Sequence, residues 1–448
     1  MSHLLWEYQR PELATWVYLS SLLTIALFFV FHRVWSLRNL DLLLLLLLGP
    51  GLLLVHNGKN HQQTERPILV AADSLDAATS VSLTPGQKSE KRGFIWLFLV
   101  GSLFLIRLLL DPVMVRRPLL DPNLSGGGLA FLVFALLLFM MANVVTSWAV
   151  VDDSTYRGPG YPFLEALPGL AVSKLPAPNQ DALPQVAEVG RGTVVVTKLL
   201  AIMANSLLIV GVLLVGFRHF NNFRAGLGVA VLYLLSPYTA LMTGQVDHTI
   251  PAALLVWAVL MYRRPVVAGI FLGVAAGLVY YPLFLLPLWI SFYWPRGLRR
   301  FGLGISVTLI LMSSMLLIGE PAQFLERTQY MFGILKPSMD GLQGVWGLGW
   351  SPSYRIPLLT AFLILACSFV FWPVQKNLGT LLSCTGAIMV AAQFWHGFGG
   401  GLYIAWYLPL LLLTVFRPNL EDRIAIKVVG GRSQNITERR AILDGEAA

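Results

Sequence analysis

The chain has 448 residues, of which 56% are hydrophobic and 12% are charged, and its formal net charge is +9. A soluble domain carries roughly a quarter charged residues, because its surface must be polar. This composition therefore excludes an ordinary soluble domain. The two cysteines, Cys367 and Cys384, both lie in apolar runs, which excludes a disulfide scaffold and a cysteine-based metal site.

Apolar segments follow one another along the chain, and most are long enough to cross about 30 Å of hydrocarbon as helices. In lipid, backbone groups must be paired within each segment, and runs such as Leu42 to Leu48 lack the alternation of a transmembrane β-barrel. We therefore expect an all-α, polytopic transmembrane protein of about 13 helices. The predicted helices cover 13–32, 40–56, 94–112, 128–150, 192–217, 225–243, 249–262, 266–280, 282–294, 301–319, 356–374, 378–395 and 402–416. The segments 266–280 and 282–294 could also be one helix that is broken around Tyr281-Pro282.

Three long polar stretches interrupt the helices and suggest how the chain is organised. The first is rich in Ser, Thr, Asp and Gln, which predicts a flexible loop. The other two contain aromatic residues and could lie against a membrane surface as interfacial helices. The expected parts are an N-terminal group of helices at 1–127 with the flexible outer loop 57–93, a core at 128–417 with outer loops 151–191 and 320–355, and a polar tail at 418–448.

The placement of Lys and Arg predicts the orientation, because basic residues in short loops prefer the cytoplasm. Alternate short connections are basic, and the intervening ones, such as 244–249 and 396–401, carry no Lys or Arg. A chain of 13 helices puts all basic short loops on one side and the three long loops on the other. We therefore expect a multi-pass protein of a bacterial inner (plasma) membrane with a cytoplasmic C-terminus. The positive charge then reports topology and gives no reason to expect a nucleic-acid partner.

Two acidic sites lie at the predicted outer boundary. Asp152 and Asp153 follow an apolar helix directly, and a carboxylate there could act as a general base on a hydroxyl group. They could equally be an acidic pair that ends a helix and faces water. Asp247 and His248 occupy a connection too short to be a mere linker. If the two sites face one cavity, their carboxylates could share a divalent cation or divide the roles of base and substrate binding.

Other polar or aromatic residues have both a structural and a functional interpretation. Arg107 and Lys198 lie inside apolar segments and could extend their charges to the surface; Lys198 could instead hold a lipid phosphate. His396 is a candidate ligand-binding residue or a buried structural histidine. Trp346 could stack on a sugar or anchor its loop at the interface.

The stretch 224–294 carries a recognisable order of features. An apolar helix ends in Ser236-Pro237, an outer Asp follows, and the next helix is closed by Arg263-Arg264. A helix with spaced glycines comes next, followed by an apolar return through Pro282 and Pro287. Such small residues let neighbouring helices approach closely.

This order resembles the core of the C-type (GT-C) membrane glycosyltransferases. That superfamily includes protein O-mannosyltransferases, aminoarabinose transferases and polyprenol-phosphate-mannose-dependent enzymes. Asp152-Asp153 matches the acidic pair that the family places at the start of its first large outer loop, and Tyr403 to Pro409 (YIAWYLP) is similar to its late outer segment. The resemblance covers about 300 residues from 128 to 416, with 224–294 as its most specific part.

The chain departs from the family where the lipid-linked phosphate would bind. Many members have a Lys where the Gly-spaced helix meets its outer turn, but this sequence has Tyr280-Tyr281-Pro282. The late segment also lacks the Arg often found near its Tyr. The phosphate would then depend on another cation, for which Lys198, Arg191 and Lys336 are candidates.

The resemblance implies an enzyme that transfers a sugar from a polyprenyl-phosphate donor at the outer face, among membrane lipids. Asp152 or Asp153 would deprotonate the acceptor, and Asp247 would orient the substrate or a cation. The other expected substrate-binding residues are His248, Lys198, Arg191, Tyr280, Tyr281, His396 and Trp346. Two alternatives remain open, a transporter or lipid flippase and a non-catalytic membrane subunit of the same ancestry.

Overall fold

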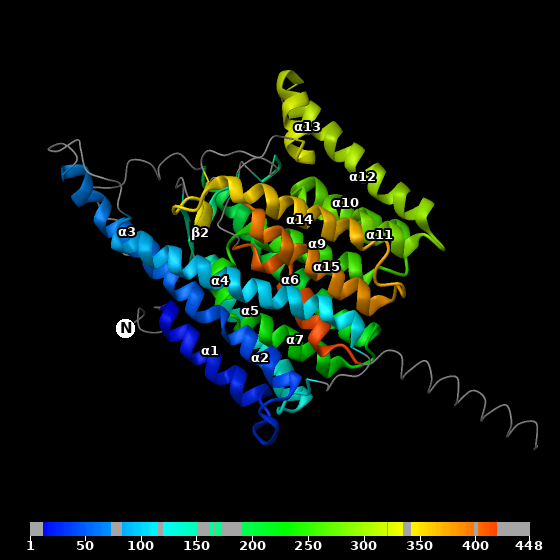
Figure 1. Ribbon diagram of the computed structural model, residues 1–448, viewed down its shortest axis with the longest axis horizontal. Coiled ribbons are helices and arrows are strands. Elements are labelled where there is room, and N and C mark those ends of the chain that lie inside the picture. Colours follow the sequence, from blue (N-terminus) through cyan, green and yellow to red (C-terminus); the bar gives the residue numbers. More distant parts are fainter. Residues whose placement is uncertain are drawn as a thin grey trace, which may run out of the picture.

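The computed structural model describes a helical bundle (Figure 1). The residues it describes are 12–72, 83–114, 120–150, 162–164, 167–171, 190–319, 321–334, 342–397 and 402–418; of 63–72, 148–150, 169, 171 and 319 only the backbone is described.

Sixteen α-helices lie within the described residues. They are α1 Leu13–Phe28, α2 Leu37–Leu46, α3 Leu48–Ala72, α4 Pro85–Leu110, α5 Gly126–Val145, α6 Arg191–Arg218, α7 Phe223–Leu235, α8 Pro237–Met242, α9 Val246–Leu260, α10 Pro265–Leu278, α11 Leu286–Tyr293, α12 Leu298–Gly319, α13 Phe324–Phe332, α14 Arg355–Ser368, α15 Leu378–Trp395 and α16 Leu408–Phe416. Short 3₁₀ helices include η2 Asp111–Val113, η6 Tyr281–Leu285, η8 Gly344–Trp346 and η11 Ile404–Trp406. Two strands, β1 Trp148–Val150 and β2 Gly169–Ala171, pair antiparallel, a small exception to the all-α prediction.

Each of the thirteen predicted segments contains a helix. Six helices in the described part of the chain are long and apolar enough to cross a membrane, and seven further apolar helices are shorter. Several predicted segments are divided. The segments around Tyr281-Pro282 form two helices, α10 and α11, with η6 between them. Helix α13 lies in the stretch where an interfacial helix was an option.

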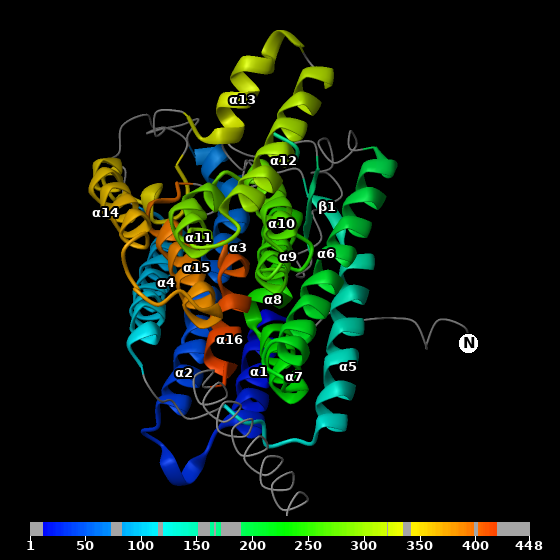
Figure 2. The ribbon, with the colours of Figure 1, turned by 90° about the vertical axis from the view of Figure 1, so that its right-hand side faces the viewer.

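The long helices run side by side, and α15 lies among them (Figure 2). In the 18-residue apolar stretch of α15, 94% of the residues are buried, whereas in the corresponding stretch of α5 28% are buried. Helices α5 and α12 instead expose large apolar side chains, such as Phe131 and Ile310. Exposed apolar faces of this extent fit an apolar surrounding better than water.

The stretch 57–93 differs from the predicted flexible loop, because α3 continues to Ala72 and α4 begins at Pro85. Thr84 and Gln87 form a reciprocal capping box that starts α4. The two helices approach closely at Gly58 and Gly93, where a Cβ atom would overlap the neighbouring backbone. The polar composition of this stretch did not predict the helical hairpin, because the hairpin is stabilised by packing between the two helices.

Helices α10 and α12 pack through glycines, as the spacing of small residues predicted. A Cβ atom at Gly304 would overlap the main-chain oxygen of Val266, whereas Gly302 on the same helix faces open space.

Replacing Gly304 by valine should therefore destabilise the protein by about 1–3 kcal/mol through overpacking. The measurement is thermal unfolding in detergent, which should show a clearly lower midpoint. Gly302→Val is the matched control and should change the midpoint little. Equal midpoints for the two variants would contradict the packing described for α10 and α12.

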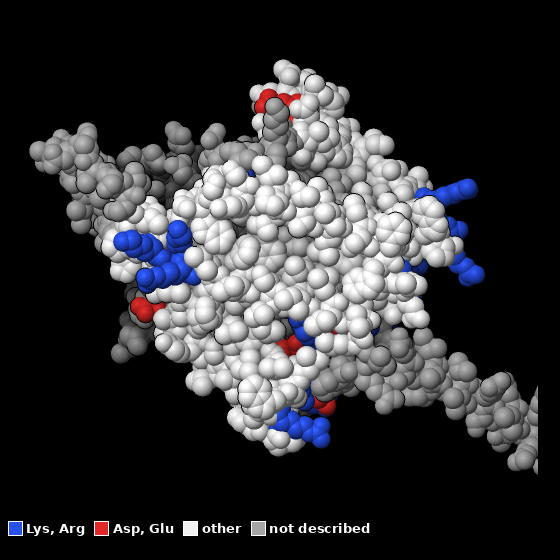
Figure 3. All heavy atoms as spheres, viewed as in Figure 1, with Lys and Arg blue, Asp and Glu red and all other residues white. Residues whose placement is uncertain are grey.

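Two of the basic connections, those that carry Arg38 and Arg224, meet the segment that precedes α5. Arg38 donates a hydrogen bond to the main-chain oxygen of Asp121 at 2.6 Å, and Arg224 donates to those of Pro122 and Leu124 at 3.1 Å. Figure 3 shows a broad surface with few charges and Lys and Arg side chains at its margins.

Candidate functional site

Ends of several helices meet in a buried group of aromatic side chains, here called the aromatic cluster. His248 lies in the first turn of α9, Tyr281 begins η6, His396 caps α15, and Tyr403 and Trp406 belong to the η11 segment. All five side chains are buried. The remaining members of the cluster are Tyr238, Tyr280 and Trp395.

Ring contacts connect four of the predicted site residues through Tyr403. The ring centroids of His248 and Tyr403 are 4.3 Å apart, and those of Tyr403 and His396 are 4.8 Å apart. His396 stacks on Tyr281 at 4.8 Å, and Tyr281 stacks on Tyr280 at 4.2 Å. Residues from three distant segments are therefore brought together in one cluster.

Asp247 lies beside this cluster and is 3% exposed. Its Oδ2 is 3.8 Å from Nε2 of His248, while Nδ1 of His248 shares a hydrogen bond with the hydroxyl of Tyr238. The indole of Trp406 donates a hydrogen bond to the main-chain oxygen of Asp247 at 3.1 Å. Because Asp247 is in the first turn of α9, the helix dipole favours its negative charge. The pair has the chemistry to accept a proton, orient a hydroxyl group or attract a cation.

Arg355 supplies a positive charge at the same place. It is the first residue of α14, is 4% exposed, and donates a hydrogen bond from Nε to the main-chain oxygen of Trp395 at 3.1 Å. Its guanidinium group lies near the phenol groups of Tyr280 and Tyr281. A Cβ atom at Gly397 would lie 2.8 Å from Nη2, so the glycine leaves room for the guanidinium group.

The sequence interpretation missed Arg355. The positions where a cation was expected are Tyr280-Tyr281-Pro282 and the segment near Tyr403, whereas Arg355 belongs to a different helix, α14. The available signal was an Arg at the start of a predicted apolar helix, directly after an aromatic-rich stretch. A charge in that position is costly unless it has partners, and the main-chain oxygen of Trp395 is one of them.

Other predicted residues have different neighbours. The ammonium group of Lys198 donates a hydrogen bond to the main-chain oxygen of Val145, at the end of α5, and Arg191 is exposed at the start of α6. Trp346 is buried against Trp350 and lines a pocket between α4 and α15. The structure therefore does not join these three residues to the aromatic cluster.

Asp152, Asp153 and Lys336 lie outside the described residues. The strand that precedes the acidic pair can be placed, because β1 pairs with β2, and Gln245 donates a hydrogen bond to the main-chain oxygen of Leu170 in β2 at 3.3 Å. The small sheet therefore lies next to the start of α9. Within the described part of the chain, no group of three His, Cys, Asp or Glu side chains could hold a metal ion.

Comparison with known proteins leaves the family undefined. No family model matches the chain, and no curated protein or solved structure matches it either. The fold itself defines a helical protein, and six helices in the described ranges are long and apolar enough to cross a membrane.

Proposed function

We propose that the chain is a multi-pass membrane glycosyltransferase of the GT-C type. It would transfer a sugar from a polyprenyl-phosphate donor to an acceptor hydroxyl at the outer face of the membrane. The observation that carries the proposal is the meeting of Asp247, His248, His396 and Arg355 within or beside one aromatic cluster at the ends of apolar helices.

Each chemical requirement of the reaction has a candidate group. Arg355 would hold the donor phosphate, because a guanidinium group forms bidentate hydrogen bonds with phosphate oxygens. Tyr and Trp side chains of the aromatic cluster would pack against the sugar ring. Asp247 would orient the substrate through His248 or attract a cation. Asp152 or Asp153 would take the proton of the acceptor.

The proposed topology has 13 membrane-crossing segments, an outer N-terminus and a cytoplasmic C-terminus, as in the inner membrane of a bacterium. In that orientation the aromatic cluster lies toward the outer surface. A donor with a long apolar chain could remain in the bilayer while its phosphate reaches Arg355. The apolar surfaces of the outermost helices support this arrangement.

Substitution of the acidic pair tests the assignment of the base. Asp152→Asn together with Asp153→Asn should lower sugar transfer by about 100-fold or more, since general-base catalysis contributes 10²–10⁴-fold. Transfer of a radiolabelled sugar from purified polyprenyl-phosphate mannose to host membrane acceptors would measure this effect. Unchanged transfer in the double variant would remove the pair from the mechanism.

A transporter or lipid flippase is the second candidate. Its specific support is a buried network of four charged side chains away from the aromatic cluster, formed by Asp41, Arg107, Asp111 and Arg417. Buried charges inside a bundle occur in transport pathways. Movement of a labelled lipid across the membrane of proteoliposomes, without a covalent product, would favour this function. If neither lipid movement nor sugar transfer is found, a non-catalytic subunit is favoured.

A further inference from the structure

A stripe along α4 changes from basic to apolar as it enters the bundle. Lys88 and Lys91 begin the stripe, and Phe94, Phe98 and Gly101 continue it at intervals of three or four residues. Residues at this spacing share one face of a helix. The stripe is about 20 Å long by helical rise. Its profile complements an amphiphile with an anionic head and an apolar chain.

The basic end of the stripe belongs to a larger patch, defined here as Lys59, Lys88, Lys91 and Arg92. Lys59, Lys88 and Arg92 are exposed, and Lys91 is half-buried. Figure 3 shows Lys and Arg side chains gathered over the neighbouring ends of α3 and α4. The patch can therefore attract an anion from solution or from a membrane surface.

The patch keeps a net positive charge, because its four cations outnumber Glu90, the acidic residue in this turn of α4. Glu90 is only 7% exposed, and its Oε2 accepts a hydrogen bond from Nε2 of Gln62 at 2.6 Å. The ammonium group of Lys91 lies against Gly349, 3.4 Å from the position of a Cβ atom there. Lys91 therefore lies next to the loop that carries Trp346 and Trp350.

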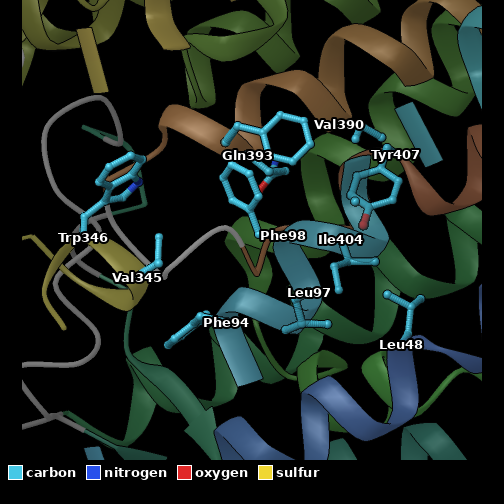
Figure 4. A pocket seen from close by; sticks show the side chains of 12 residues that line it. Leu48, Phe94, Leu97, Phe98, Val345, Trp346, Val390, Gln393, Ile404 and Tyr407 are labelled. Carbon is cyan, nitrogen blue, oxygen red and sulfur yellow. The ribbon is translucent and has the colours of Figure 1, made fainter. Parts of the chain in front are cut away.

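A narrow pocket follows the stripe below the patch (Figure 4). Its walls come from α4, α15, η8 and η11, and include Phe98, Trp346 and Tyr407. The cavity volume is about 30 Å³, which holds a group of about the size of a water molecule, so an apolar chain fits only after aromatic walls such as Phe98 turn aside.

Gln393 provides an independent sign of a ligand in this pocket. Its side chain lines the pocket and is 8% exposed, and its Nε2 donates a hydrogen bond to the main-chain oxygen of Met389 at 3.1 Å. Its Oε1 is buried and has no hydrogen-bond partner among the described residues. A buried amide oxygen is stabilised by a donor, so a ligand with a hydroxyl or amide N–H at this depth would complement it.

We propose that the basic patch and the pocket form a binding site for a single-chain lipid phosphate with a hydrogen-bond donor on its chain. Lys88 and Lys91 hold the phosphate, the chain follows the apolar stripe, and Gln393 accepts the hydrogen bond. The basic patch lies on the α3–α4 hairpin, whereas Gln393 and the opposite wall of the pocket come from the later part of the chain. It does not depend on the proposed sugar transfer.

Binding of hexadecyl phosphate to the full chain in phosphatidylcholine nanodiscs tests the head-group contact. Lys88→Gln with Lys91→Gln should weaken binding by about tenfold or more, since each cation near an anionic lipid contributes several-fold. Arg299→Gln with Arg300→Gln removes two exposed charges elsewhere and should have little effect. Hexadecanol and inorganic phosphate should each compete poorly, because hexadecanol lacks the phosphate and inorganic phosphate lacks the apolar chain.

Hexadecyl phosphates hydroxylated at successive chain carbons test the role of Gln393. At least one should bind the native chain several-fold more tightly than the plain lipid, and Gln393→Met should abolish that preference while keeping the thermal unfolding midpoint. Equal affinity of the native and lysine variants for hexadecyl phosphate would overturn the proposal. So would equal competition by hexadecanol, equal binding of inorganic phosphate, or the absence of any hydroxyl preference.

Discussion

Arg107→Met should destabilise the folded protein by about 3–5 kcal/mol, because it leaves buried carboxylates without their main cation. Arg107 donates hydrogen bonds to both carboxylate oxygens of Asp41, at 2.6 and 3.0 Å. It also lies 3.5 Å from Asp111, whose other oxygen is 2.8 Å from Arg417. The four side chains are buried and their formal charges balance.

Unfolding in detergent as temperature or denaturant rises measures this loss. Arg107→Met combined with Asp41→Leu is the decisive comparison, because removal of both charges avoids the isolated buried carboxylate and should recover most of the stability. A single variant as stable as the native chain would show that the ion pair does not hold α2 against α4. An Arg107 side chain that extends to the surface, as expected from the sequence, would leave the stability of the single variant unchanged.

Arg355→Met should lower sugar transfer by about 100-fold or more, if the guanidinium group stabilises the phosphate as it leaves. Arg355→Lys should recover only part of the activity, since an ammonium group keeps the charge but loses the bidentate geometry. The assay is transfer of radiolabelled sugar from the polyprenyl-phosphate donor, with kcat and KM measured separately.

Arg263→Met is the matched control for this prediction. Arg263 lies near the opposite end of α9 from Asp247 and stacks over the ring of Tyr262 at 5.6 Å. Its loss removes a cation and a ring contact without touching the aromatic cluster, so transfer should remain near the native rate. Equal losses in the two variants would point to a general effect of charge or folding.

Hydrophobic patterning made much of the helical fold predictable. Continuous apolar segments have few structural alternatives, so each predicted segment contains a helix. The error at 57–93 arose because the residues that make this hairpin stable, such as Gly58 and Gly93, act through contacts between two helices. The prediction that Arg107 extends its charge to the surface was wrong for a similar reason, because its partner Asp41 is 66 residues away in the sequence.

The candidate site was only partly predictable. Asp247, His248 and His396 were predicted as site residues because polar groups at the ends of apolar helices are costly unless they have partners or a function. The structure brings them together around Tyr403. Arg355 could not be assigned to the site, because the approach of α14 to the end of α15 depends on tertiary packing. Lys198 has a local backbone partner instead.

The most direct test of the proposed function is an assay of the purified chain in nanodiscs with a polyprenyl-phosphate donor labelled in its sugar. The native chain should form a covalent sugar product with host membrane acceptors, and Asp247→Asn should reduce that product by about 100-fold or more if the carboxylate orients the reacting groups. If the native chain forms no product, or Asp247→Asn transfers sugar at the native rate, the assignment of sugar transfer to this site is wrong.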